Sequence, residues 1–185
     1  GRPTFNDYFE YSNKNILGNV IIANSDIVYD NTINRIENIL ENEFIVITRY
    51  EKYNNIFKLK HFNEDGKDKD PNLFNKVNIF SQDTWIFKSP MYDNIDIPLF
   101  AGSMFSDSYI NYRVDRSKYT VYNKSKFINS YHIQNEKSLS ELITQEEQTK
   151  VLGKLHKLVN YETTNFILGV PLQEVNGFQE ELISW

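Results

Sequence analysis

Asn24, Ser25 and Asp26 interrupt an otherwise apolar stretch and are the first residues of the chain that could do chemistry. They follow residues 19–23, which read as a core strand, and ligands in open α/β sheets bind beyond the carboxyl ends of the strands. A carboxylate there commonly holds a hard divalent cation, which prefers oxygen ligands and shares itself with a substrate phosphate. The same residue types also build turns and cap helices, so a plain turn is the preferred interpretation of this segment alone.

Three later segments carry polar side chains in comparable places. Gln82, Asp83 and Trp85 lie next to a predicted strand, although a turn residue and a core tryptophan explain them as well. Asp107 falls in the first turn of a predicted helix, where an acid gains from the helix dipole and where a general base would also be well placed. His132 lies in a strand pattern, where a single histidine is more often a hydrogen-bonded, half-buried side chain than a ligand.

An alternation of helices and strands must position these side chains. Thr4 and Asp30 are suitable N-caps, and the first strand is apolar on both faces, as in the centre of a covered parallel sheet. The alternation is typical of an α/β fold. The first elements that we expect are a helix over 4–14, a strand over 19–23, a helix over 31–41 and a strand over 43–50.

The second half of the chain continues with shorter elements. A charged loop that contains Gly and Pro is expected over 63–72, and Ser106 is the natural N-cap of the helix that carries Asp107. Ser138 with Glu141 forms a capping box, which predicts a helix to about residue 149. The further expected strands cover 84–88, 119–123 and 126–134, and residues 151–185 are expected to pack on the main body.

Composition excludes several classes of protein. The 185 residues contain no cysteine, so disulfides and cysteine metal sites are absent, and no apolar run is long enough to cross a membrane. The net charge of −5 disfavours a nucleic-acid partner. We therefore expect a cytoplasmic globular protein. A metal-dependent nuclease built on Asp26, Glu51, Asp65 and Lys67 is a minor alternative.

Taken together, four motifs in order resemble the GT-A type of nucleotide-sugar-dependent glycosyltransferases, in their bacterial and viral members. "IIANSDI" looks like the acidic metal motif that ends a core strand, and "SQDTWIFK" is similar to the strand that borders the acceptor site. "AGSMFSDSYINYRV" resembles the turn and helix that carry the base of inverting members. "YTVYNKSKFINSYHI" resembles the strand whose histidine lies near the metal or diphosphate. The resemblance covers about residues 2–134.

The resemblance implies a Rossmann-like, mostly parallel sheet, shortened at its N-terminus, with a catalytic core over 1–137 and a helical extension over 138–185. It implies an enzyme that moves a sugar from a nucleotide-sugar donor to a glycan or other hydroxyl acceptor with Mn²⁺ or Mg²⁺ on the donor diphosphate. The implied roles are Asp26 and His132 as metal ligands, Asn24 and Ser25 in donor binding, Gln82, Asp83 and Trp85 in acceptor binding, and Asp107 as catalytic base.

Two departures keep an alternative open. Asn24 stands where the metal motif usually has its first acid, and only one helix precedes the motif strand, although the family normally builds much of its nucleotide pocket there. A non-catalytic sugar-binding or scaffold module with a degenerate glycosyltransferase fold is therefore the alternative. Either an upstream domain of the same polypeptide or a homo-oligomer would be compatible with the sequence.

Overall fold

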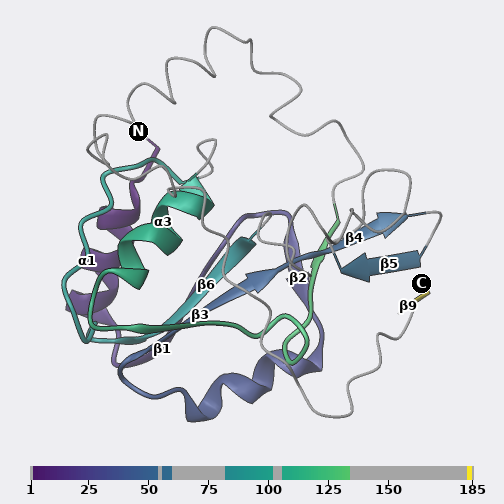
Figure 1. The fold of residues 1–185 in the computed structure, drawn as a ribbon, viewed down its shortest axis with the longest axis horizontal. Helices are drawn as coiled ribbons and strands as arrows, with labels where there is room; N and C mark the ends of the chain where they lie inside the picture. The colour runs from purple at the N-terminus through teal and green to yellow at the C-terminus, as the bar shows by residue number, and fades with distance from the viewer. Residues whose placement is uncertain (1, 54–55, 60–81, 102–105, 134–182, 185) are drawn as a thin grey trace, which may run out of the picture.

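The computed structural model describes residues 2–53, 56–59, 82–101, 106–133 and 183–184 (Figure 1). In these residues the chain forms a mixed α/β structure with two β-sheets and helices packed against the first sheet. The α/β class predicted from the alternation of elements is therefore confirmed. No helix among the described residues is long and apolar enough to cross a membrane.

The first sheet has the strand order β1 (Gly18–Ala23), β6 (Gln82–Ser89), β3 (Glu43–Thr48) and β7 (Thr120–Asn123). Strand β6 runs antiparallel to both of its neighbours, and β3 with β7 is the only adjacent pair of this sheet that is parallel among the described strands. The expected mostly parallel sheet is therefore wrong, and the sheet is mixed. An apolar strand buried on both faces has the same composition in either direction, so the sequence pattern could not reveal the reversed strand.

Strand β1 lies at the edge of this sheet among the described strands, although a central position was expected. Val20 and Ile22 are buried, whereas Ile21 between them is 38% exposed. This alternation is that of a strand with one face on the core. The central positions belong to β6 and β3, whose side chains are almost all buried.

Helices cover both faces of the first sheet. The helices α1 (Phe5–Asn15) and α3 (Ser106–Asp115) lie on one face, and the 3-10 helix η1 (Asn31–Asn38) lies on the other (Figure 1). Thr4 forms a capping box with Asp7 at the start of α1, and Asp30 caps η1 by accepting from the backbone of Thr32. Both N-caps were predicted correctly, although the second helix is a shorter 3-10 helix.

Alternate residues of the central strands β3 and β6 face opposite sides of the sheet and belong to two different apolar clusters. Phe44 and Phe87 stack 5.8 Å apart under α1 and α3, while Ile45 and Ile86 face η1. Three side chains of α3 lie in the core next to α1: these are Tyr109, Ile110 and Val114. Because α3 packs on β6 and β7, its first turn is held at a fixed place beside the sheet.

The second sheet has the order β2 (Ile27–Tyr29), β8 (Ser130–His132), β4 (Tyr50–Tyr53), β5 (Ile56–Leu59) and β9 (Ile183–Ser184). The expected strand over 43–50 is in fact two strands that belong to different sheets, and the strand expected over 126–134 is reduced to three residues. In both cases the apolar pattern continues through a bend, which periodicity alone does not detect.

The chain passes from the first sheet to the second at three places, at residues 24–26, at residue 49 and over residues 124–129. We call this region the sheet junction. The strands β1, β3 and β7 all end there and β6 begins there, because β6 is antiparallel to its neighbours. The junction therefore gathers residues from four strands of the first sheet and from β2, β4 and β8 of the second.

Several expectations fall outside the described residues. The loop over 63–72, the helix beginning at Ser138 and the boundary between residues 137 and 138 belong to this group. The appendage expected over 151–185 also belongs to it, apart from Ile183 and Ser184, which form β9. Asp65 and Lys67 of the nuclease alternative do so too. These expectations remain predictions.

Candidate functional site

His132 lies between two carboxylates at the sheet junction. Its Nε2 atom is 3.1 Å from Oδ2 of Asp26, and its Nδ1 atom is 3.1 Å from Oε2 of Glu51. The antiparallel pairing of β2 with β8 brings Asp26 and His132 together, and the backbone N–H of Ile133 donates to the carbonyl of Asp26. Glu51 comes from β4, which pairs with the other side of β8.

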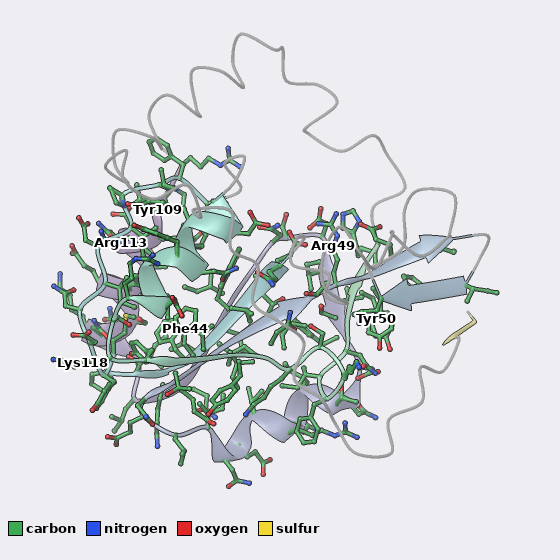
Figure 2. The ribbon with its side chains drawn as sticks, viewed as in Figure 1. Phe44, Arg49, Tyr50, Tyr109, Arg113 and Lys118 are labelled. Atoms are coloured by element: carbon green, nitrogen blue, oxygen red, sulfur yellow. The ribbon has the colours of Figure 1, made fainter. Side chains whose placement is uncertain are left out.

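Arg49 connects Glu51 to a third carboxylate. Its Nε atom donates to Oε1 of Glu51 at 2.7 Å, and its Nη1 atom donates to Oδ2 of Asp83 at 2.5 Å. These three side chains are between 11% and 17% exposed, so the ion pairs are largely removed from water. Figure 2 shows Arg49 at the end of β3, next to Tyr50 and far from Lys118 on the opposite side of the molecule.

Asn24 completes the cluster from the end of β1. Its Nδ2 atom donates to Oδ1 of Asp83 at 2.6 Å, and its backbone N–H donates to the carbonyl of Asp83 at 3.1 Å. Both carboxylate oxygens of Asp83 therefore have partners. We call the continuous set of hydrogen-bonded side chains the junction network, with the members Asn24, Asp26, Arg49, Glu51, Asp83 and His132.

The electrostatics of the junction network follow from its burial and its carboxylates. The hydrogen bond to Glu51 raises the pKa of His132, against the opposing effects of burial and of Arg49. Burial raises the pKa of Asp83, although the Arg49 guanidinium acts against this. Burial alone would lower the pKa of Arg49, but the carboxylates of Asp83 and Glu51 hold it above its ordinary value. The network thus sets three carboxylates against one guanidinium and one imidazole.

The structure brings together four of the residues predicted from the sequence, Asn24, Asp26, Asp83 and His132, and separates others. Asp26 and His132 are in contact, and Asp83 is close enough for their charges to act on its pKa. Ser25 is exposed in the turn between β1 and β2. Trp85 is 2% exposed and packs edge-on against Phe5 in the core, so its ring does not face the junction surface.

Asp107 lies in the first turn of α3, as predicted, and is half-buried. Asn111, one turn further along this helix, donates a hydrogen bond to the side-chain oxygen of Gln82, which begins β6 next to Asp83. Residues four apart on a helix share a face. The helix α3 is therefore attached, one turn after Asp107, to the strand end that carries Asp83.

Sequence reasoning missed Arg49 and gave Glu51 only a minor role in the nuclease alternative. Both residues follow a buried strand in the segment "TRYE", and residues two apart in an extended chain point to the same side. Two opposite charges with this spacing, directly after a strand buried on both faces, were a signal that could have indicated them.

The contact between Asp26 and His132 is a hydrogen bond, and its length also matches the spacing that two ligands of a divalent cation would have. Two ligand atoms at right angles around an octahedral cation, each about 2.1 Å from it, lie roughly 3.0 Å apart, and Nε2 of His132 lies 3.1 Å from Oδ2 of Asp26. Glu51 on the other ring nitrogen is the carboxylate partner that metal-bound histidines usually have. Among the described residues, no group of three or more His, Cys, Asp or Glu side chains is arranged to hold a metal. The remaining ligands would thus be water or substrate oxygens.

A separate open pocket of about 290 Å³ lies at the C-terminal end of α3. Its lining includes Arg113 and Arg116 from α3 and Asp93 from the segment after β6. This end of α3 leads into β7, which pairs with the start of β3, whereas Arg49 follows the end of β3. The pocket is therefore at the opposite end of the sheet from the junction network.

Comparisons of this chain with protein-family models, with curated proteins and with solved structures find no match.

Proposed function

We propose that the protein is a glycosyltransferase that uses a divalent cation to move a sugar from a nucleotide-sugar donor to a hydroxyl acceptor. The observation that supports this proposal best is the contact between Asp26 and His132. The sequence resemblance assigns both residues to the cation, although they are 106 positions apart, and their side chains lie 3.1 Å from each other. A resemblance without physical meaning would give no reason for two such distant side chains to meet.

In this proposal Asp26 and His132 hold Mn²⁺ or Mg²⁺ together with donor phosphate oxygens and water. Mg²⁺ in particular is usually bound through one or two protein side chains and substrate phosphates, so a two-residue site is sufficient. When bound, the cation supplies positive charge that stabilises the nucleoside diphosphate as it leaves. The surplus of carboxylates in the junction network favours its binding.

Asp107 acts in this proposal as the general base. The acceptor hydroxyl attacks the anomeric carbon of the donor and gives its proton to the Asp107 carboxylate. The new bond joins the acceptor oxygen to the sugar, the bond between the sugar and the diphosphate breaks, and the diphosphate leaves with its electron pair. The attachment of α3 to β6 through Asn111 and Gln82 supports this assignment, because a base must sit on a rigid element.

The acceptor side would use the start of β6. Asp83 is anchored by Asn24 and Arg49, so it would contribute a fixed carboxylate to an acceptor hydroxyl. Trp85 is left out of this part of the proposal because its ring is buried against Phe5. The use of the Asn24 amide to hold Asp83 favours the alternative, a sugar-binding module, because that amide is then occupied rather than directed at a donor phosphate.

The test is a thermal-shift and turnover experiment on the full chain. Mn²⁺ with uridine or guanosine diphosphate should raise the melting temperature more than either component alone, because the cation joins protein and diphosphate. Hydrolysis of nucleotide-sugars, measured by release of the nucleoside diphosphate, should require the same cation.

Two variants make the test specific. Asp26→Asn should remove the joint effect of Mn²⁺ and diphosphate, while Glu41→Gln, which changes an exposed carboxylate on the segment before β3, should retain it. If Asp26→Asn retains the joint effect of Mn²⁺ and diphosphate, the cation does not bind at Asp26. Binding of free sugars without any effect of nucleotide or metal would support the sugar-binding module instead.

A further inference from the structure

We infer that Glu51 and Arg49 are positioning residues of the proposed cation site, with Glu51 orienting the His132 ring and Arg49 orienting Glu51. This inference rests on the proposed function for the identity of the bound ion. The orientation itself rests on the observed hydrogen bonds, and it assigns a role to two residues outside the motifs singled out in the sequence.

Glu51 controls which ring nitrogen of His132 faces Asp26. An ionised carboxylate only accepts hydrogen bonds, so the 3.1 Å contact requires a proton on Nδ1. By the same reasoning Nε2, which lies 3.1 Å from Oδ2 of Asp26, donates to that carboxylate in the cation-free protein. A cation would replace the Nε2 proton, while the bond from Nδ1–H to Glu51 would keep Nε2 directed at the carboxylate that would share the cation.

Arg49 holds Glu51 through a rigid group. The guanidinium is planar, so one group directs separate N–H bonds at Glu51 and at Asp83 in a fixed geometry. Glu51 therefore has one oxygen on Arg49 and the other on His132, which leaves its side chain little freedom to rotate. Since the same guanidinium also holds Asp83, Arg49 fixes the spacing between the cation side and the acceptor side of the site.

The rival explanation is that Arg49 and Glu51 form an ion pair that merely stabilises the fold or lends negative charge to the site. Two substitutions of Glu51 separate the effect of its charge from the effect of its side-chain length. Glu51→Asp keeps the charge but shortens the side chain by one methylene, so that it no longer reaches His132. Glu51→Gln removes the charge but keeps the length and one acceptor oxygen.

The experiment has two readouts on the full chain. Metal-free crystal structures of the wild type and both variants give the separation between His132 Nε2 and Asp26 Oδ2, and titration with Mn²⁺ alone gives the dissociation constant. We expect the ring to stay beside Asp26 in Glu51→Gln and to move away in Glu51→Asp. The dissociation constant should rise roughly 10- to 100-fold in Glu51→Asp and less in Glu51→Gln. The matched control is Glu10→Asp, an exposed carboxylate on α1, which should change neither readout.

The outcomes distinguish this inference from the proposed function. A His132 ring that stays against Asp26 in Glu51→Asp overturns the positioning role, and so does weaker Mn²⁺ binding in Glu51→Gln than in Glu51→Asp. If the ring moves as expected but the wild type binds no Mn²⁺, then Glu51 orients His132 but no cation binds there. That result would contradict the proposed function. Arg49→Lys supplies a second test, because a lysine keeps the charge but lacks the planar group that fixes both carboxylates, so it should also weaken Mn²⁺ binding. Unchanged Mn²⁺ binding in Arg49→Lys would overturn the positioning role of Arg49.

Discussion

Asn24 and Asp83 are joined twice at the sheet junction, once through their backbones and once through their side chains. The backbone bond continues the pairing of β1 with β6, and the side-chain bond satisfies the Asp83 oxygen that Arg49 does not contact. Asn24 is thus a hydrogen-bond donor to a buried carboxylate, and an acid in its place would face that carboxylate directly.

Replacing Asn24 should therefore destabilise the protein according to the charge introduced. Asn24→Ala leaves one oxygen of Asp83 without its donor and should lower the free energy of unfolding by about 1–3 kcal/mol. Asn24→Asp should cost more than Asn24→Ala, because it places a second negative charge against Asp83. Urea unfolding at pH 7 measures both, with Asn38→Asp at the exposed end of η1 as control. Equal stability of Asn24→Asp and the wild type would show that the contact between residue 24 and Asp83 does not contribute to stability.

Asp30 should make stability depend on acid pH. Burial acts to raise the pKa of Asp30, but hydrogen bonds from Thr32, Asn129 and Tyr131 outweigh it, and the pKa lies below its ordinary value of 3.8. A carboxyl group with a lowered pKa in the folded state contributes stability that is complete above the ordinary value and is lost as the pH falls through the folded value.

The measurement compares the wild type with Asp30→Ala. At pH 7 the variant should be less stable by about 1–2 kcal/mol, which is typical of a lost N-cap. The difference should narrow as the pH is lowered below 3.8, where the folded carboxylate becomes protonated. Glu37→Ala, an exposed position on the same helix η1, is the control. A difference that stays constant down to pH 2 would argue against the role of the charged carboxylate.

Asp107→Asn tests the proposed base. Because an amide cannot accept the acceptor proton, the turnover number should fall roughly 10²- to 10⁴-fold, while the dissociation constant of the donor should change little. Both constants come from steady-state kinetics and from thermal shifts with the nucleoside diphosphate. Asp115→Asn, an exposed position at the other end of α3, should leave turnover unchanged. Unaltered turnover in Asp107→Asn would remove this residue from the chemistry.

Neighbouring residues of β1 should differ sharply in their effect on stability. Ile22 is 7% exposed in the core next to α1, so Ile22→Ala should lower the free energy of unfolding by about 2–5 kcal/mol. Ile21 is 38% exposed on the opposite face, so Ile21→Ala should cost less than about 1 kcal/mol. Urea unfolding gives both values. Similar large losses at both positions would place β1 inside the sheet rather than at its edge.

The sequence predicted those structural features that depend only on neighbouring residues. Thr4 and Asp30 could be recognised as N-caps because a cap needs only its own helix turn. The edge position of β1 and the direction of β6 could not be predicted, because both depend on which distant strands pair. The division of the strand over 43–50 was missed for a similar reason, since Tyr50 pairs with Tyr131 on the distant strand β8 of the second sheet.

The residues of the candidate site were likewise predicted only in part. The pairing of Asp26 with His132 was suggested by the order of the motifs, and the structure brings the two side chains together. Arg49 and Glu51 could not be assigned from the motifs, because their roles depend on partners from β6 and β8. The buried state of Trp85 depends on α1 through Phe5, so a tryptophan next to polar residues was not a sufficient sign of a sugar-stacking ring.

The three crossings between the sheets have a consequence for the order of folding. Apart from the bond between Arg49 and Glu51, every side-chain bond of the junction network joins residues at least 34 positions apart, and the longest spans 106. Closing such long loops requires most of the chain to be in place, so these bonds form late. Fragments that end at residue 53 would contain Asp26, Arg49 and Glu51 but neither Asp83 nor His132. An ion bound between Asp26 and His132 would therefore select the completed fold over partly folded chains, and would slow unfolding rather than speed the first steps of folding.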